Sequence, residues 1–426
     1  MQRLLNIKKN ILHNITKTEK LKKTKLKNDL ILPHQPIHDD FLQTMTQVFH
    51  WSKWIGIVGL ESSVWKIWGF IILTLYVAIE GEAIWKVIKA LAGWAIDIAG
   101  HRSIAARLSG CVYYTGTLLG MLQCWRLSSS WKGLRKYWAS IEWVLSIQYV
   151  PPDATLKKRM YLTIGIFAAF TTSKFEHISN VLSHLNFHCE PSQCLRKYIL
   201  NSHGFLLLDF EYSDWIGVVV SFMRILATMV WNLRDLLIIL TSMGLTSRYK
   251  RLNECVAKVA ARDSQGKEWL YLWRKIREAY VKQSLLVKRV DNSLGVLILL
   301  SAFFNFYFIC LQLFLGIMQE KDTPVREAYY VISIAWLSVR TGYTVVAAAD
   351  VCKYSTMALP TLYECNAQCY NIEIERLQKQ LVNEYVALSG MEFFYLNRTF
   401  VLQMSGAVVT YVLVLIQYDD SDATVT

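Results

Sequence analysis

The stretch GVLILLSAFFNFYFICLQLFLGI, residues 295–317, decides the fold because it runs for 23 residues without a charged side chain. A helix needs about 20 mainly apolar residues to cross the hydrocarbon core of a bilayer. Apolar runs of similar length recur along the chain and are separated by basic segments. The sequence therefore predicts an all-α polytopic membrane protein with seven transmembrane helices, at residues 66–85, 106–126, 160–180, 214–241, 295–317, 328–349 and 397–418.

The distribution of charge predicts how these helices are oriented. The 426 residues are 53% hydrophobic, yet Lys and Arg exceed Asp and Glu by 13. The basic residues gather in the N-terminal segment and in the loops 127–159 and 242–294, and such segments stay on the cytosolic side of a membrane. We therefore expect a cytosolic N-terminus and, with seven spans, an extracellular C-terminus. Because the basic residues are spread over several loops, they do not indicate a nucleic-acid partner.

This topology divides the chain into segments, two of which should form cytosolic helices. In 268–290, apolar residues recur at helical spacing between basic ones, and a second helix is expected across 361–388, with Leu377, Leu381 and Tyr385 on one side. We expect the two helices to pack together, although binding to the inner leaflet stays open. The predicted segments are 1–60 (basic, cytosolic), 61–241 (spans one to four), 242–294 (cytosolic helical extension), 295–349 (spans five and six), 350–396 (cytosolic helix), 397–418 (last span) and 419–426 (acidic tail).

Prolines and cysteines narrow the class of protein. All seven prolines lie outside the predicted spans, whereas many transporters bind substrate at interrupted helices within internal repeats. The pattern thus favours a receptor or a channel. The nine cysteines form no CxxC pair, and no HExxH, GxSxG or Walker motif is present, so we expect no metal, no cofactor and no enzymatic activity. Cys189 and Cys194 could form a disulfide only if their loop is extracellular.

The end of the last span carries a specific pattern. The sequence TYVLVLIQY at 410–418 resembles the Thr-Tyr, five mostly apolar residues, Gln-Phe sequence that ends the insect gustatory receptors. The resemblance extends over about 60–418 and is closest to the sugar-receptor clade. It is also carried by WASIE at 138–142, EHIS at 176–179, WNLRDL at 231–236, GLTSRY at 244–249 and ALSGMEFF at 387–394.

This resemblance implies a seven-helix subunit that assembles as a homotetramer around a central pore lined by the last span. A small sugar or polyol would bind in the outer half of each subunit, and cations would pass non-selectively. Heteromers with related receptors stay open, and the implied location is the plasma membrane of chemosensory neurons. Val412 stands where the sugar clade commonly carries Glu, and Tyr418 replaces the terminal Phe, so the exact sugar is left open.

The residues of the last span fit a pore. Thr410, Val414, Gln417 and Tyr418 fall at i, i+4, i+7 and i+8, which places them on one face of a helix. Rings of Gln417 would offer amide oxygens to hydrated cations, and rings of Val or Tyr could close by dewetting. The alternative is that Gln417 only caps the end of a packed span. Three Asp in the tail 419–426 would surround the mouth of such a pore.

A sugar site needs aromatic faces and several hydrogen-bonding groups, and polar groups inside spans are candidates because they are costly there. By the resemblance, Trp336 looks like the aromatic floor of the pocket. For Arg340, an ion pair with Glu176 or Asp235 is an open alternative to ligand contacts at those carboxylates. The candidate ligand-binding residues are Tyr113, Tyr114, Glu176, His177, Trp231, Asn232, Asp235, Asn305, Tyr307, Gln312, Tyr330, Ser333 and Trp336.

The sequence thus predicts a gustatory receptor that acts as a sugar- or polyol-gated non-selective cation channel. Three alternatives stay open: a secondary sugar transporter, a receptor for bitter compounds, and a subunit that responds only beside a related receptor.

Overall fold

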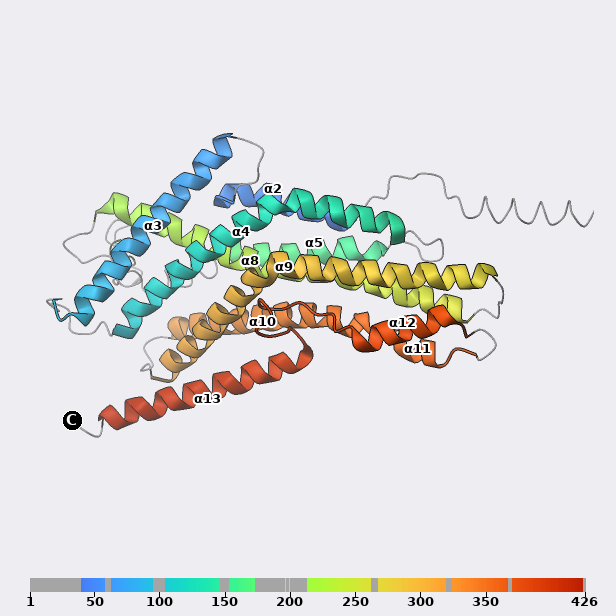
Figure 1. Cartoon of the computed structure of the whole chain (residues 1–426). Helices are drawn as coiled ribbons and strands as arrows, with labels where there is room; N and C mark the ends of the chain where they lie inside the picture. The colour runs from blue at the N-terminus through green and yellow to red at the C-terminus, as the bar shows by residue number, and fades with distance from the viewer. Residues whose placement is uncertain are drawn as a thin grey trace, which may run out of the picture.

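The computed structural model describes residues 40–57, 63–94, 104–145, 153–172, 213–261, 267–318, 324–366 and 370–423, with 196 and 199. All regular elements in these ranges are helices (Figure 1). They are α2 (Asp40–Trp51), the 3-10 helix η1 (Ser52–Ile55), α3 (Ser63–Leu91), α4 (Ile104–Leu145), α5 (Ala154–Thr172), α8 (Asp214–Ala260), α9 (Lys267–Met318), α10 (Pro324–Ser355), α11 (Leu359–Tyr363), α12 (Ile372–Asn383) and α13 (Arg398–Ala423).

The prediction of an all-helical membrane-type chain is confirmed. The predicted apolar runs fall, in order, on α3, α4, α5, α8, α9, α10 and α13, although residues 173–180 of the third run lie outside the described part. Within the described residues, α3, α8, α9 and α10 are long and apolar enough to cross a membrane, and α13 carries a shorter apolar stretch, Arg398–Val414. The count of seven spans and the sides of the two termini stay predictions.

Helices α8 and α9 are much longer than the spans that they contain. They have 47 and 52 residues, which at 1.5 Å per residue gives about 70 and 78 Å, more than twice the thickness of a bilayer core. Both helices pass through the predicted boundaries at 241 and 294, because no proline interrupts the backbone hydrogen bonds there. The predicted extension is therefore continuous with the spans.

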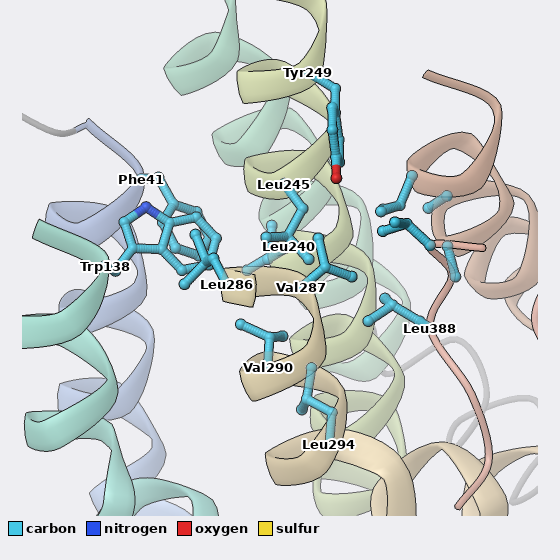
Figure 2. Packing of buried hydrophobic residues seen from close by; sticks show 14 of the residues in the cluster. Phe41, Trp138, Leu240, Leu245, Tyr249, Leu286, Val287, Val290, Leu294 and Leu388 are labelled. Atoms are coloured by element: carbon cyan, nitrogen blue, oxygen red, sulfur yellow. The ribbon is translucent and has the colours of Figure 1, made fainter. Parts of the chain in front are cut away.

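The predicted amphipathic segment 268–290 is confirmed as a packed helix. It forms the first part of α9, and its Trp273, Ile276 and Tyr280 are fully buried. Around them, Leu245 of α8, Val287 of α9 and Leu388 point into one core (Figure 2). Because the apolar face of this helix is covered by protein, packing rather than the membrane surface accounts for its amphipathicity.

The helix predicted across 361–388 is confirmed only in part: α12 covers 372–383 and buries Leu377 and Leu381, but the predicted bounds are too wide. Pro360 stands near the start of the short α11, and a separate helix, α12, begins at Ile372 because the Asn371 side chain accepts hydrogen bonds from the next backbone N–H groups. The helix ends at Asn383, because Glu384 already has an extended backbone (φ −97°, ψ 104°), so the predicted part 384–388 is not helical. Tyr385, expected on the buried side with Leu377 and Leu381, is exposed.

Helical structure also extends into both predicted end segments. Helix α2 lies within the segment 1–60 and buries Phe41, whose ring stacks on Trp138 of α4 with centroids 4.3 Å apart (Figure 2). At the other end, α13 continues past residue 418 to Ala423, so the acidic residues Asp419, Asp420 and Asp422 belong to the helix.

Candidate ligand site

An aromatic cluster surrounds Trp231 of α8. The rings of Tyr113 and Trp231 are stacked, with centroids 5.5 Å apart and planes 6° from parallel. The Trp231 indole donates a hydrogen bond to Thr117 Oγ1 at 2.9 Å, and Phe304 of α9 meets its ring edge on. The ring lies directly on α4 at Gly116, where a Cβ would come within 2.7 Å of Trp231 Cζ2. Three helices therefore meet at one tryptophan.

A second group of candidates joins α9 to α10. Gln312 Nε2 donates to Ser333 Oγ at 3.4 Å, and the Tyr330 hydroxyl donates to the Gln312 backbone carbonyl at 2.8 Å. The other side-chain atom of this amide, Gln312 Oε1, is buried and has no hydrogen-bond partner among the described residues. A buried acceptor without a donor is costly, so this oxygen is available to a hydroxyl of a bound molecule.

Trp336 lies one turn along α10 from Ser333 and faces α5. Its ring is stacked on Phe170 at 4.1 Å between centroids and meets Phe167 edge on at 5.4 Å. Its Nε1 is buried and, within the described part of the chain, has no acceptor. Trp336 and Gln312 thus offer an aromatic face, a buried donor and a buried acceptor without partners among the described residues, which are the kinds of group that recognise a small polyol.

Three other candidates, Asn232, Asp235 and Asn305, are brought together in a buried polar cluster. Arg340 of α10 reaches all three: its Nε lies 2.9 Å from Asp235 Oδ2, Nη1 donates to Asn232 Oδ1 at 2.9 Å, and Nη2 donates to Asn305 Oδ1 at 3.1 Å. Of the two ion pairs left open for Arg340, the structure has the one with Asp235. These polar groups are thus engaged within the protein, and their role as direct ligand contacts stays a prediction.

Ser301 completes this cluster and was not identified from the sequence. Its hydroxyl donates to Asp235 Oδ1 and accepts from Asn305 Nδ2. Ser301 and Asn305 are four residues apart on α9, and this spacing of two polar residues inside an otherwise apolar run could have revealed it.

The remaining candidates are not gathered around the same point. Tyr114 faces α3, where its ring lies 6.3 Å from that of Tyr76, and Tyr307 contacts the ring of Phe308. Glu176 and His177 lie outside the described residues, as do Cys189 and Cys194. The structure therefore places the candidates around α8, α9 and α10 without one shared contact point.

Among the described residues, no helix covers the predicted pore residues Thr410, Val414 and Gln417 of α13. Thr410, Val414 and Gln417 are exposed, and the side chain of Tyr418 lies outside the described part. Elsewhere, α13 packs against α9 and α10, and its Tyr411 contacts Phe306 of α9. In the described part of a single subunit, the face with Thr410, Val414 and Gln417 is exposed.

A small cavity lies in the extension of α8 and α9 beyond their predicted spans. It is lined by Tyr249, Tyr280, Ser284, Ser355, Gln380, Leu381, Glu384 and Val386. Ser355 is 19 residues after Trp336 on α10, which corresponds to about 28 Å along the helix. This cavity is therefore separate from the candidate ligand site.

Comparison with known proteins gives a consistent result. A family model described as trehalose receptor matches residues 64–426. The chain is 30% identical over 330 residues to the gustatory receptor for sugar taste 64a of Drosophila melanogaster, covering 74% of this chain and 70% of that protein. It is 26% identical over 367 residues to the gustatory receptor 5a for trehalose of the same organism, covering 84% and 78%.

Solved structures agree on the fold. The insect olfactory receptor OR5 from Machilis hrabei, in complex with eugenol, aligns with a TM-score of 0.64 at 14% identity, covering 89% of this chain and 100% of that one. A second structure of the same receptor aligns with a TM-score of 0.63 at 13% identity, with the same coverage of 89% and 100%. At this identity the match speaks for the fold alone.

Proposed function

Because the chain belongs to the trehalose receptor family of gustatory receptors, we propose that it is a taste receptor that a small sugar or polyol opens as a non-selective cation channel. The observation that carries this proposal is the match to curated receptors for sugar taste and for trehalose over most of the chain. Ligand binding would favour an open state of the pore, and the resulting cation current would be the whole signal.

The chemistry around α10 supports a polyol ligand. The indole N–H of Trp336 and the amide oxygen of Gln312 are buried hydrogen-bonding groups without partners among the described residues. A sugar hydroxyl can both donate and accept, and the apolar face of a sugar ring packs against aromatic rings. Tyr330 and Ser333 hold the neighbouring polar groups in place. We propose the candidate ligand-binding residues named in the sequence analysis as the binding residues, with Trp336 and Gln312 as direct contacts.

The exposed face of α13 supports a pore between subunits. Thr410, Val414 and Gln417 are exposed, and no other described helix of the chain covers them. In a homotetramer, four such faces would enclose a central pathway, with rings of Gln417 offering amide oxygens to cations. We propose that assembly, and the plasma membrane of chemosensory neurons as its location; heteromers with related receptors remain compatible with the same face.

The test is a current measurement on cells that express this chain alone, against a panel of about twenty sugars and polyols. We expect a cation current with at least one of them. In Trp336→Phe, which keeps an aromatic ring but removes the N–H, the half-maximal sugar concentration should rise about 2- to 10-fold, as expected for one hydrogen bond. Trp215→Phe, at a tryptophan that is 82% exposed on α8, is the matched control and should leave the response unchanged.

The other outcomes assign the alternatives. Accumulation of labelled sugar without a matching current would identify a transporter. A response to bitter compounds but to no sugar would identify a receptor for bitter compounds. If cells that express this chain alone give no response, but cells that also express a related receptor do, the chain is an obligate subunit. An unchanged sugar response in Trp336→Phe would remove Trp336 N–H from the list of contacts.

A further inference from the structure

Counting the described residues, the polar cluster between α8, α9 and α10 holds two positive charges and one negative charge. Asp235 is completely buried and lies beside both Arg234 and Arg340, which are 1% and 6% exposed. The other members, Asn232, Ser301 and Asn305, are neutral. A buried charge normally needs one partner to offset its lost hydration. Arg340 alone would balance Asp235, so a second buried arginine requires an explanation.

The two arginines are not equivalent. Arg340 makes three contacts of 3.1 Å or less, with Asp235, Asn232 and Asn305. Arg234 is only loosely held: its Nε lies 3.6 Å from Asp235 Oδ1, and its Nη2 lies 3.5 Å from Asn305 Oδ1. Its guanidinium rests over the Trp231 ring at 4.5 Å from the centroid. Arg340 is therefore the present partner of the carboxylate, and Arg234 stands beside it.

The helices that carry these residues decide what happens when α10 moves. Arg234 and Asp235 are neighbours on α8, whereas Arg340 is on α10. A displacement of α10 would pull Arg340 away from Asp235 but would leave Arg234 where it is. A shift of less than about 1 Å would bring Arg234 from 3.6 Å to hydrogen-bonding distance of the same carboxylate.

The cluster also lies between the proposed ligand contact and the proposed pore helix. Trp336 is one helical turn before Arg340 on α10. On α9, Asn305 of the cluster is followed by Phe306, whose ring contacts Tyr411 of α13 at 6.3 Å between centroids. A movement of α10 that starts at Trp336 would therefore act on the cluster first and reach α13 through α9.

We propose that Arg234 is a positioning residue for gating: it replaces Arg340 as the partner of Asp235 when ligand binding displaces α10. The exchange keeps the buried carboxylate paired in both conformations, so a weakly bound sugar does not have to break a buried ion pair outright. This inference rests on the proposed ligand-gated function. It assigns the two arginines opposite roles, with Arg340 holding the resting state and Arg234 permitting the activated one.

The test compares Arg234→Met and Arg340→Met, which remove each charge but keep a long apolar side chain. In Arg234→Met we expect normal surface expression and a sugar response whose half-maximal concentration rises at least 10-fold. In Arg340→Met we expect a larger basal current or a lower half-maximal concentration. Arg274→Met removes an exposed arginine paired with Glu278 on α9 and should change neither. A purely structural cluster would instead weaken the response in both variants, and that result would overturn the proposal.

A second measurement does not depend on the ligand or on current. Melting of the solubilised chain is compared among wild type, Arg234→Met, Arg340→Met and the double variant. Because Arg234 is expected to take over Asp235, Arg340→Met should still fold, and the double variant should lose far more stability than the two single losses combined. Additive losses, or an Arg340→Met chain that fails to fold, would overturn the exchange. A wild-type chain without any sugar current, both alone and beside a related receptor, would refute the proposed function while leaving this comparison valid.

Discussion

Replacing Phe41 should show that the N-terminal helix α2 is an integral part of the core. Phe41 is 1% exposed, its ring stacks on Trp138 at 4.3 Å, and it meets Trp131 edge on at 6.3 Å. Removing a buried aromatic ring costs about 3–5 kcal/mol of unfolding free energy, because the transfer free energy is lost and a cavity remains. We therefore expect Phe41→Ala to be among the most destabilising single changes outside the spans.

The expected change in melting temperature follows from the length of the chain. An unfolding entropy of about 2.1 cal/mol/K per residue, applied to 426 residues, gives roughly 0.9 kcal/mol/K. A loss of about 3–5 kcal/mol then lowers the melting temperature by about 3–6 °C. The assay is thermal unfolding of the detergent-solubilised chain at one fixed scan rate, since unfolding of such proteins is commonly irreversible.

Gly244 of α8 provides an independent check of the same contact. A Cβ at this position would lie 2.6 Å from Phe41 Cδ2, so Gly244→Ala must displace the ring. The penalty of Gly244→Ala should therefore largely disappear in the Phe41→Ala background, because the ring is no longer there. Trp51→Ala, at the half-exposed end of α2, is the control and should cost much less. A shift below about 1 °C for Phe41→Ala, or full additivity with Gly244→Ala, would refute the packing described here.

Two further predictions concern polar contacts outside the predicted spans. Arg277 donates a hydrogen bond to Glu373 at 2.6 Å, and this bond is the main cause that lowers the pKa of Glu373 below its usual value. The ion pair therefore stabilises the fold at pH values above the unfolded pKa of about 4.3. This stability is lost as the pH falls through the lower pKa of the folded state. Melting curves at pH 7 and pH 3 should show a smaller acid-induced loss in Glu373→Gln than in wild type, and equal losses would contradict this. Asp291 accepts hydrogen bonds from the Ser389 backbone N–H and hydroxyl at 2.6 and 2.7 Å, so Asp291→Asn should cost about 1.5–3 kcal/mol. Asp350→Asn, at an exposed contact with Arg398, should cost far less in the same melting assay, and a similar cost for both would contradict the assignment.

Much of the fold could be predicted because apolar runs and helical periodicity are local properties of the sequence. The apolar run at 295–317 correctly predicted helical structure, which is the second part of α9, without information on the neighbouring helices. The spacing of Trp269, Trp273 and Tyr280 correctly indicated a buried face in the first part of α9. The helix expected across 361–388 was right only for α12, because apolar residues continue past Asn383 where the backbone leaves the helical conformation. The chain after α12 is held against α9, where Asp291 accepts hydrogen bonds from Ser389, and periodicity does not reveal such a contact.

The candidate site was only partly accessible from the sequence. Trp336 and Ser333 could be placed on one side of a helix from their spacing, yet nothing in the sequence indicated that Trp336 packs against Phe170 of α5. The residues Asn232, Asp235 and Asn305 were correctly singled out as unusual inside spans. In the structure these three residues contact Arg340. This arrangement depends on how α8, α9 and α10 pack, which the sequence does not show.

The sequence by itself determined that this chain is an all-helical membrane-type protein, and its terminal pattern identified the family, because both are written in the order of residues along one segment. The tertiary structure alone decided which arginine pairs with Asp235, which buried groups are left without partners, and that Phe41 closes the core from the N-terminal side. The physical reason is that pairing and burial depend on distances between side chains that are far apart in the sequence, and only the packed helices set those distances.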